Sequence, residues 1–143
     1  MKIFDYAVPA GQIKIAIPDG AFGESYAASN TSYEPHLTAY LFPTLGDGKV
    51  FIDIGANVGI HSLLSALVVG NSGKVISVEP DRRNTECLYK SKLLNNFSQL
   101  QIWPVAASEE LRPEALLEDD ASNSGVRGLD HVTESVYAIV QGV

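Results

Sequence analysis

Val50-Phe51-Ile52-Asp53-Ile54-Gly55-Ala56-Asn57-Val58-Gly59 is the stretch that decides the fold of this 143-residue chain. Its first five residues form a β-prone run, as expected for a parallel strand that is buried on both faces. Gly55 to Gly59 predict a turn, and the apolar pattern of Ile60 to Val69 predicts a helix. A strand, a glycine turn and a helix in this order place a ligand at the carboxyl end of a parallel sheet.

The residues that follow repeat this alternation of strand and helix. We expect a strand at Lys74 to Val78, a helix from Arg82 to about Leu94 that Asp81 caps, and a third strand at Gln99 to Val105. A βαβαβ run requires a parallel sheet with right-handed crossovers. The predicted fold class is therefore α/β, a Rossmann-like three-layer α/β/α sandwich.

The N-terminal residues carry a different pattern. Phe4 to Val8 and Gln12 to Ile17 alternate apolar and polar side chains, which predicts a short hairpin. Residues 21–31 are rich in small and polar side chains and predict a loop. Ser32 then predicts the start of a helix that runs from His36 to Phe42 and ends at Pro43. We divide the chain into N-terminal strands and loop, 1–32, and a Rossmann-like domain, 33–143.

The signal weakens after residue 106. Leu111 to Leu117 are compatible with a turn of helix or with a loop, and Glu118 to Asp120 form an acidic run that suits a solvated loop better than a divalent metal site. Val126 and the segment Val136 to Val140 predict late strands.

Composition excludes several classes of function. A net charge of −7 argues against a nucleic-acid or anionic-membrane surface, since both need a basic patch. Cys87 is the single cysteine, so neither an internal disulfide nor a cysteine-based metal site is possible. The longest apolar passage, Leu63 to Val69, is too short to cross a bilayer. We expect a cytoplasmic protein that binds no metal.

The spacing of the glycines narrows the choice of ligand. A dinucleotide fingerprint, G-x-G-x-x-G, has its outer glycines five residues apart, but Gly55 and Gly59 are four apart and Asn57 takes the middle place. The carboxylate of Asp53 suits a cationic amino group and repels a pyrophosphate. Because S-adenosylmethionine carries an ammonium and a sulfonium and no phosphate, the pattern favours that cofactor.

Glu79 ends the second predicted strand, twenty residues after Gly59. An acid in this place can accept hydrogen bonds from ribose hydroxyls. Both dinucleotides and S-adenosylmethionine have a ribose, so Glu79 is informative only together with Asp53. Pro80 fixes the exit from the strand.

The stretch from Val50 to Ser62, together with Gly73-Lys74-Val75-Ile76-Ser77-Val78-Glu79-Pro80, resembles the FkbM-type family of S-adenosylmethionine-dependent methyltransferases. The similarity extends over roughly residues 30–128 and takes in Tyr33-Glu34-Pro35, Pro104 to Ser108 and the polar loop Asp119 to Gly125. It implies an enzyme that transfers a methyl group to a hydroxyl of a sugar or small molecule. The candidate cofactor-binding residues are Glu34, Asp53, Gly55, Ala56, Asn57, Gly59, His61, Ser62, Glu79, Pro80, Ala106 and Ser124.

The roles of three of these residues stay open. Glu34 is either an acid favoured at a helix start or a contact for the cofactor's amino group. Asn57 either tolerates an unusual backbone angle or lines the pocket. His61 lies either on the helix surface or at the mouth of the pocket, and the sequence identifies no general base.

The resemblance also implies a departure from the family pattern. Members continue with a strand that reads roughly Ile-Lys-Ile-Asp-Val-Glu-Gly, which is absent here, so the sandwich is expected to be incomplete at its C-terminal side. An edge of the strand Val50 to Ile54 would then be exposed, which predicts a homodimer through that edge, or aggregation. The alternatives to a methyltransferase are a non-catalytic module that binds the cofactor and a nucleotide-dependent oxidoreductase.

Overall fold

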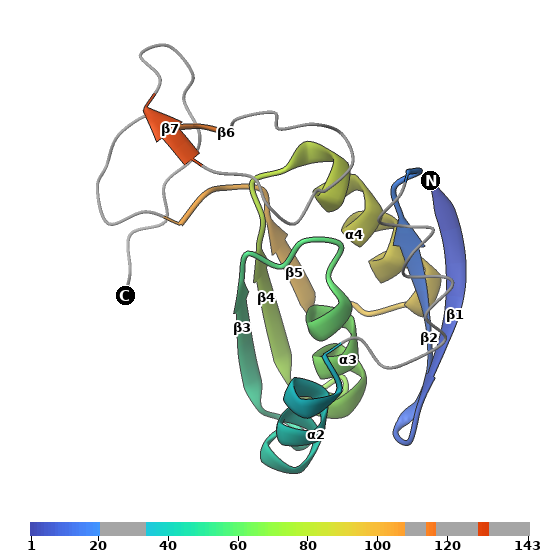
Figure 1. The fold of residues 1–143 in the computed structure, drawn as a ribbon. Helices are drawn as coiled ribbons and strands as arrows, with labels where there is room; N and C mark the ends of the chain where they lie inside the picture. Colours follow the sequence, from blue (N-terminus) through green and yellow to red (C-terminus); the bar gives the residue numbers. More distant parts are fainter. Residues whose placement is uncertain (21–33, 108–113, 117–128, 132–143) are drawn as a thin grey trace.

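The computed structural model describes residues 1–20, 34–107, 114–116 and 129–131. The elements are β1 (Lys2–Val8), β2 (Gly11–Ile17), α2 (Pro35–Thr44), β3 (Val50–Ile54), α3 (Ile60–Val69), β4 (Lys74–Val78), α4 (Arg82–Asn95), β5 (Leu100–Trp103), β6 (Glu114–Leu116) and β7 (Leu129–His131). Figure 1 shows the sheet β3-β4-β5 on one side and the hairpin β1-β2 on the other, with α3 and α4 between them.

The central sheet is parallel and has the strand order β3-β4-β5. The strand order moves in one direction, so two right-handed crossovers place α3 and α4 on the same face of the sheet. Val75, Leu100 and Ile102 point into this interface and are buried. The predicted Rossmann-like α/β class is confirmed. In the part of the chain that the structure describes, no helix packs on the opposite face.

The third strand is shorter than predicted. It ends at Trp103 instead of Val105, because the backbone N–H of Val105 turns back and donates to the Trp103 carbonyl at 2.9 Å. The other two strands, α3 and the start of α4 have the predicted limits. Asp81 caps α4 as predicted, since its Oδ1 accepts from the Arg83 N–H at 2.8 Å.

The hairpin of β1 and β2 shares the core of the sheet and helices. Ile13, Ile15 and Ile17 alternate along β2, and all three are buried against α3 and α4. The outer edge of β2 is covered by α4: the Ala16 N–H donates to Ser91 Oγ, and the backbone of Lys14 exchanges two hydrogen bonds with the Asn95 amide. Side chains of a helix therefore satisfy an edge that would otherwise invite another strand.

Two predictions about local structure are wrong. The helix α2 runs through Pro43 to Thr44, because a hydrogen bond of 2.8 Å from the Leu45 N–H to the Leu41 carbonyl holds the last turn. Residues 114–116 form the strand β6, which pairs antiparallel with β7, where a helical turn or a loop was expected. The loop 21–31, Ser32, Glu118 to Asp120, Val126 and Val136 to Val140 lie outside the described residues.

Two constraints require a glycine at position 59, which ends the glycine turn. Its φ is +83°, a left-handed conformation that side chains disfavour. A Cβ at this position would lie 2.0 Å from Leu88 Cδ1 of α4, so the absence of a side chain lets Leu88 pack against the turn that precedes α3. Gly55 shares the positive φ, at +78°, but a Cβ there would meet open space.

We therefore expect Gly59→Ala to destabilise the fold by about 2–5 kcal/mol, the sum of backbone strain and a clash with Leu88. Gly55→Ala is the matched control and should cost only the backbone strain, about 1–2 kcal/mol. Urea denaturation followed by circular dichroism measures both. Equal losses in the two variants would contradict the close contact between Gly59 and Leu88.

Candidate functional site

The predicted site residues gather where the three parallel strands end. The register pairs Ile54 with Val78 and Val78 with Trp103, so the carboxyl ends of β3, β4 and β5 lie at one edge of the sheet. The glycine turn follows β3 at this edge, Glu79 and Pro80 follow β4, and the buried Ala106 comes three residues after β5. Ser124 lies outside the described residues.

The glycine turn keeps its own N–H groups occupied. In dinucleotide and phosphate sites such groups point at the ligand. Here each of the five donates within the protein: Gly55 and Ala56 to the Val78 carbonyl at 2.8 and 3.1 Å, Asn57 to Glu79 Oε2 at 2.8 Å, Val58 to Asn57 Oδ1 at 2.8 Å, and Gly59 to the Ala56 carbonyl at 2.8 Å. The turn is therefore not a phosphate cradle.

Asn57 adopts the unusual backbone angle that the sequence allowed. Its φ is +54°, which places its N–H against Glu79 and its side-chain oxygen against Val58. A side chain that hydrogen-bonds locally makes this conformation accessible to asparagine. Asn57 thus joins the turn to the end of β4.

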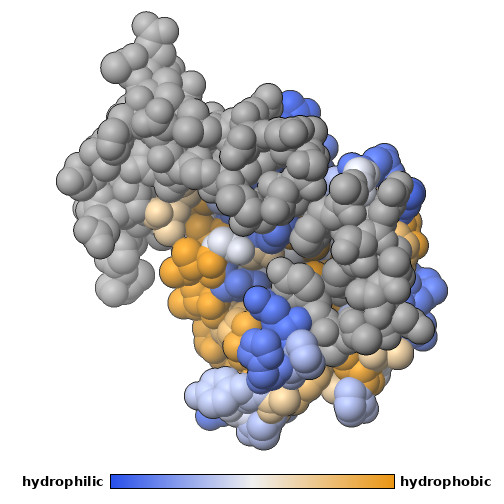
Figure 2. All heavy atoms as spheres, in the orientation of Figure 1, coloured by the Kyte–Doolittle hydropathy of each residue, from blue (hydrophilic) through white to orange (hydrophobic). Residues whose placement is uncertain are grey.

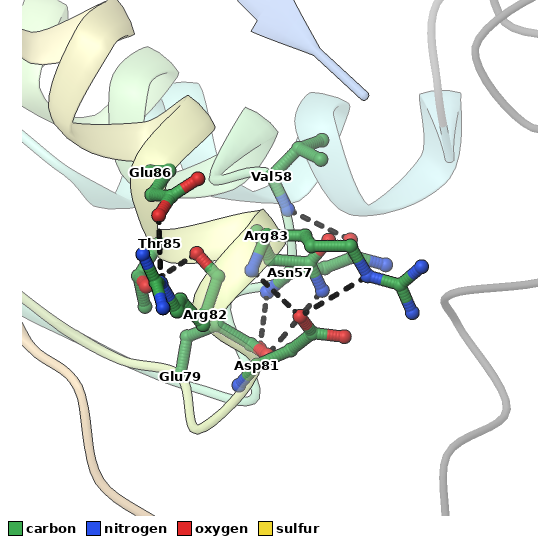
Figure 3. Close-up of polar contacts among 9 residues, drawn as sticks. Asn57, Val58, Glu79, Asp81, Arg82, Arg83, Thr85 and Glu86 are labelled. Atoms are coloured by element: carbon green, nitrogen blue, oxygen red, sulfur yellow. Dashed lines mark hydrogen bonds and ion pairs between the residues drawn. The ribbon is translucent and has the colours of Figure 1, made fainter. Parts of the chain in front are cut away.

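Glu79 is buried, with 6% of its surface exposed. Figure 3 shows it with Asn57 and Asp81, where the glycine turn meets the first turn of α4. Its Oε2 accepts from the Asn57 N–H, and its Oε1 accepts from the Asp81 N–H at 2.9 Å and from Asn84 Nδ2 at 3.3 Å. Burial raises the pKa of Glu79, and these donors lower it in part.

The carboxylate of Glu79 is more engaged than the sequence suggested. A carboxylate offers about four lone-pair sites, and three are taken here, which leaves about one for a ligand hydroxyl. A second ligand hydroxyl would compete with the long bond from Asn84. The sequence did not assign Asn84 to the site, although an amide five residues after the acid, in the first turn of α4, was a usable signal.

Asp53 lies half-buried at the end of β3 and points toward α3. Its Oδ2 accepts from Ser62 Oγ at 2.5 Å. Desolvation by burial raises the pKa of Asp53, while the Ser62 hydrogen bond and the charge of His61 lower it in part. The backbone N–H of Ser62 also favours the ionised form of Asp53, so the first turn of α3 stabilises this carboxylate through both its backbone and its side chain.

Glu34 and His61 lie together at the N-terminal ends of α2 and α3. Glu34 Oε2 and His61 Nε2 are 2.8 Å apart, and Glu34 holds a left-handed φ of +44°. Glu34 is the N-cap residue of α2, where the helix dipole favours an acid, although its side chain makes no capping hydrogen bond. Nε2 of His61 is held by Glu34 and its Nδ1 is buried, an arrangement poorly suited to a general base.

Comparisons with known proteins come from sequence and from structure. No protein-family model matches the chain. The chain is 32% identical over 126 residues to a Sulfurisphaera tokodaii protein described as "probable cobalt-precorrin-6B C(15)-methyltransferase (decarboxylating)", covering 88% of this chain and 56% of the relative. A Sulfolobus acidocaldarius protein of the same description is 26% identical over 129 residues, covering 89% and 65%. The chain thus spans less than two thirds of either curated relative.

Solved structures resemble the described fold more distantly. A SAM-dependent O-methyltransferase from Thermotoga maritima superimposes with a TM-score of 0.45 and 20% identity, over 71% of this chain and 40% of that one.

The described part of the chain contains neither a cluster of metal-ligating side chains nor a helix that could span a membrane. Within residues 1–20, 34–107, 114–116 and 129–131, no three His, Cys, Asp or Glu side chains come together in a group that could hold a metal ion. Over the same ranges, every helix is too short or too polar to span a bilayer.

The raised pKa of Asp53 gives a testable dependence of stability on pH. A carboxyl whose pKa is higher in the folded state favours folding at low pH, and this contribution is lost as the pH rises through the folded-state pKa. We expect Asp53→Asn, which cannot ionise, to be more stable than the wild type at pH 8. The advantage should shrink toward pH 4.

Melting temperatures measured from pH 4 to pH 8 test this expectation. Asp5→Asn is the control, because Asp5 is an exposed carboxylate paired with Lys14 on the surface and should change stability little. A melting curve of Asp53→Asn parallel to that of the wild type across the range would contradict it.

Proposed function

We propose that this edge of the sheet binds S-adenosylmethionine and that the protein is a methyltransferase. The observation that carries the proposal is the pairing of two desolvated carboxylates, Asp53 and Glu79, with a glycine turn whose N–H groups are already used. Such a site is rich in acceptors and poor in donors. It fits a ligand with cationic and hydroxyl groups and no phosphate.

The parts of the ligand divide between the two acids. The carboxylate of Asp53, whose Oδ2 accepts from the Ser62 hydroxyl, would pair with the ammonium of the methionine moiety. Glu79 retains about one acceptor site for a ribose hydroxyl. When bound, the cofactor supplies a methyl group on a sulfonium for in-line displacement, and the contribution of this chain is to position it.

The curated relatives support the reaction class. Both are described as methyltransferases, and each aligns with nearly nine tenths of this chain. Because the chain spans only part of their length, the activity of the whole protein remains a proposal.

Two classes of methyl acceptor have support from different observations. The FkbM-type resemblance of Val50 to Pro80 favours a hydroxyl of a sugar or small molecule, whose proton a general base must take. The description of the relatives names C(15) of cobalt-precorrin-6B, a carbon acceptor. Transfer of a labelled methyl group to a cobalt-precorrin, compared with transfer to a panel of hydroxylated small molecules, distinguishes the two.

Titration calorimetry with S-adenosylhomocysteine tests the cofactor site. We expect the wild type to bind and the isosteric variants Asp53→Asn and Glu79→Gln each to lose about 10- to 100-fold in affinity, the usual effect of removing a hydrogen bond to a charged group. NAD is the control ligand and should not bind. Binding of NAD in place of S-adenosylhomocysteine would favour an oxidoreductase, and binding without transfer to any acceptor would favour a non-catalytic module.

We also propose that the protein forms a homodimer through β3. Among the described strands none pairs with the outer edge of β3, and Val50, Ile52 and Ile54 are 61%, 57% and 68% exposed. Figure 2 shows hydrophobic atoms on this flank of the molecule. These three apolar side chains suit pairing with a second copy of β3, because an antiparallel partner centred on Ile52 places Val50 opposite Ile54 of that copy.

A cytoplasmic location, suggested by the lone Cys87, also stays a proposal.

Light scattering coupled to gel filtration tests the dimer. Ile52→Lys should convert a dimer to a monomer, since a charge within the paired edge opposes strand addition. Leu93→Lys, at a position on α4 that is 72% exposed, should leave the mass unchanged. A monomeric wild type, or a dimer that survives Ile52→Lys, would overturn the proposal.

A further inference from the structure

Two buried serines connect β4 to the carboxylate of Asp53. Ser77 Oγ donates to Ser62 Oγ at 2.6 Å, and Ser62 Oγ donates to Asp53 Oδ2 at 2.5 Å. Asp53 and Ser77 are direct neighbours in the register of β3 and β4, so both side chains point to the face that α3 covers. Ser62 comes from the first turn of α3 and lies between them.

The direction of this chain of hydrogen bonds is fixed by its composition. Each hydroxyl has one proton to donate, and the ionised carboxylate at the end can only accept. Ser62 and Ser77 have no exposed surface, so water does not compete for their protons. A hydroxyl that itself accepts a hydrogen bond becomes a better donor, and hydrogen bonds in a medium of low polarity reinforce each other in this way.

We propose that Ser62 and Ser77 are positioning residues that hold the Asp53 carboxylate ionised and turned toward the ammonium of the methyl donor. The identity of that ligand rests on the proposed function, whereas the effect of the serines on Asp53 does not. Ser62 was predicted to contact the cofactor. In the structure its hydroxyl donates a hydrogen bond to Asp53. Ser77 was not anticipated, although a polar residue at a buried position of a β-prone strand was a signal.

The other charged groups near Asp53 are few. His61, on α3, is the titratable group whose charge favours ionisation of Asp53, and it is paired with Glu34 at the start of α2. On the side of β4, Glu79 follows the strand, and its carboxylate accepts hydrogen bonds from Asn57, Asp81 and Asn84. Burial works against the charge on Asp53, so removal of the Ser62 hydroxyl should raise the pKa of this carboxyl further.

The chain offers a control for a purely structural role. Ser65 lies one turn after Ser62 on α3 and is equally buried, at 1% exposure, but its hydroxyl has no hydrogen-bond partner among the described residues. Ser65→Ala therefore removes the same atom from the same helix without touching Asp53. Alanine is the best helix former, so both substitutions on α3 should leave the helix intact.

The decisive experiment is a carbon-13 NMR titration of the Asp53 side-chain carboxyl in the ligand-free protein, with the signal assigned by its loss in Asp53→Asn. Ser62→Ala should move the midpoint to higher pH, Ser77→Ala should move it in the same direction by less, and Ser65→Ala should leave it in place. An unchanged midpoint in Ser62→Ala overturns the inference. Should Ser62→Ala fail to fold, an unchanged midpoint in Ser77→Ala overturns it as well.

Affinity for S-adenosylhomocysteine as a function of pH supplies the second readout. Ser62→Ala should bind about tenfold more weakly than the wild type at a pH below the Asp53 midpoint that the NMR titration gives for this variant, and should recover above that midpoint, where Asp53 ionises without help. A loss of affinity independent of pH would reduce Ser62 to a packing role and overturn the inference. A wild type that fails to bind refutes the proposed function alone, since the NMR titration still decides whether the serines control Asp53.

Discussion

The in-register parallel pairing of β3 with β4 is the constraint on which the rest of the structure depends. It places Asp53 beside Ser77 and brings the carboxyl ends of both strands to one edge of the sheet. It also supplies the Val78 carbonyl, which accepts hydrogen bonds from the N–H groups of Gly55 and Ala56 in the glycine turn. A slip of one residue would reverse the face of every side chain on β3. Asp53 would then lose its hydrogen bond with Ser62, and the exposed aliphatic side chains of β3, Val50, Ile52 and Ile54, would point into the core.

The proposed preference of this site for a ligand without phosphate rests on hydrogen bonds that the protein makes with itself. A glycine turn before a helix is ordinarily read as a site for phosphate, because its N–H groups and the helix dipole attract an anion. Here Glu79 takes the N–H of Asn57, and Val78 takes two more. Glu79 therefore has two effects at once: it engages an N–H of the turn that a phosphate would need, and it brings negative charge to the same edge of the sheet.

The parts of the fold that could be predicted are those whose signal is local. Val50 to Ile54, Ile60 to Val69 and Lys74 to Val78 carry their own periodicity, and the structure has these elements with the limits that the sequence indicated. Asp53 and Glu79 could be placed because residues that end parallel strands share an edge. The end of α2 was missed, because Pro43 only weakens a last turn that Leu45 still closes.

Contacts between distant segments could not be read from the sequence. The packing of the hairpin on α4 depends on Ser91 and Asn95 meeting the edge of β2, some eighty residues away along the chain, and neither residue carries a signal for it. The contact between Glu34 and His61 likewise joins two elements whose approach depends on tertiary packing. The short strand β6 needs β7 as its partner, so its own three residues do not predict it.

The two acids proposed to bind the methyl donor, and the side chains that hydrogen-bond to them or position them, all come from a short part of the chain. Asp53, Ser62, Ser77, Glu79 and Asn84 lie on β3, α3 and β4 and at the start of α4, within residues 50–85, and each is tied to another by a hydrogen bond. This half of the site needs no contribution from the residues after β5 to be formed. A hydroxyl acceptor would also need a general base, and the side chains of these five residues already make hydrogen bonds to one another. If this edge binds the methyl donor as proposed, the group that takes the acceptor's proton is therefore to be sought outside this set.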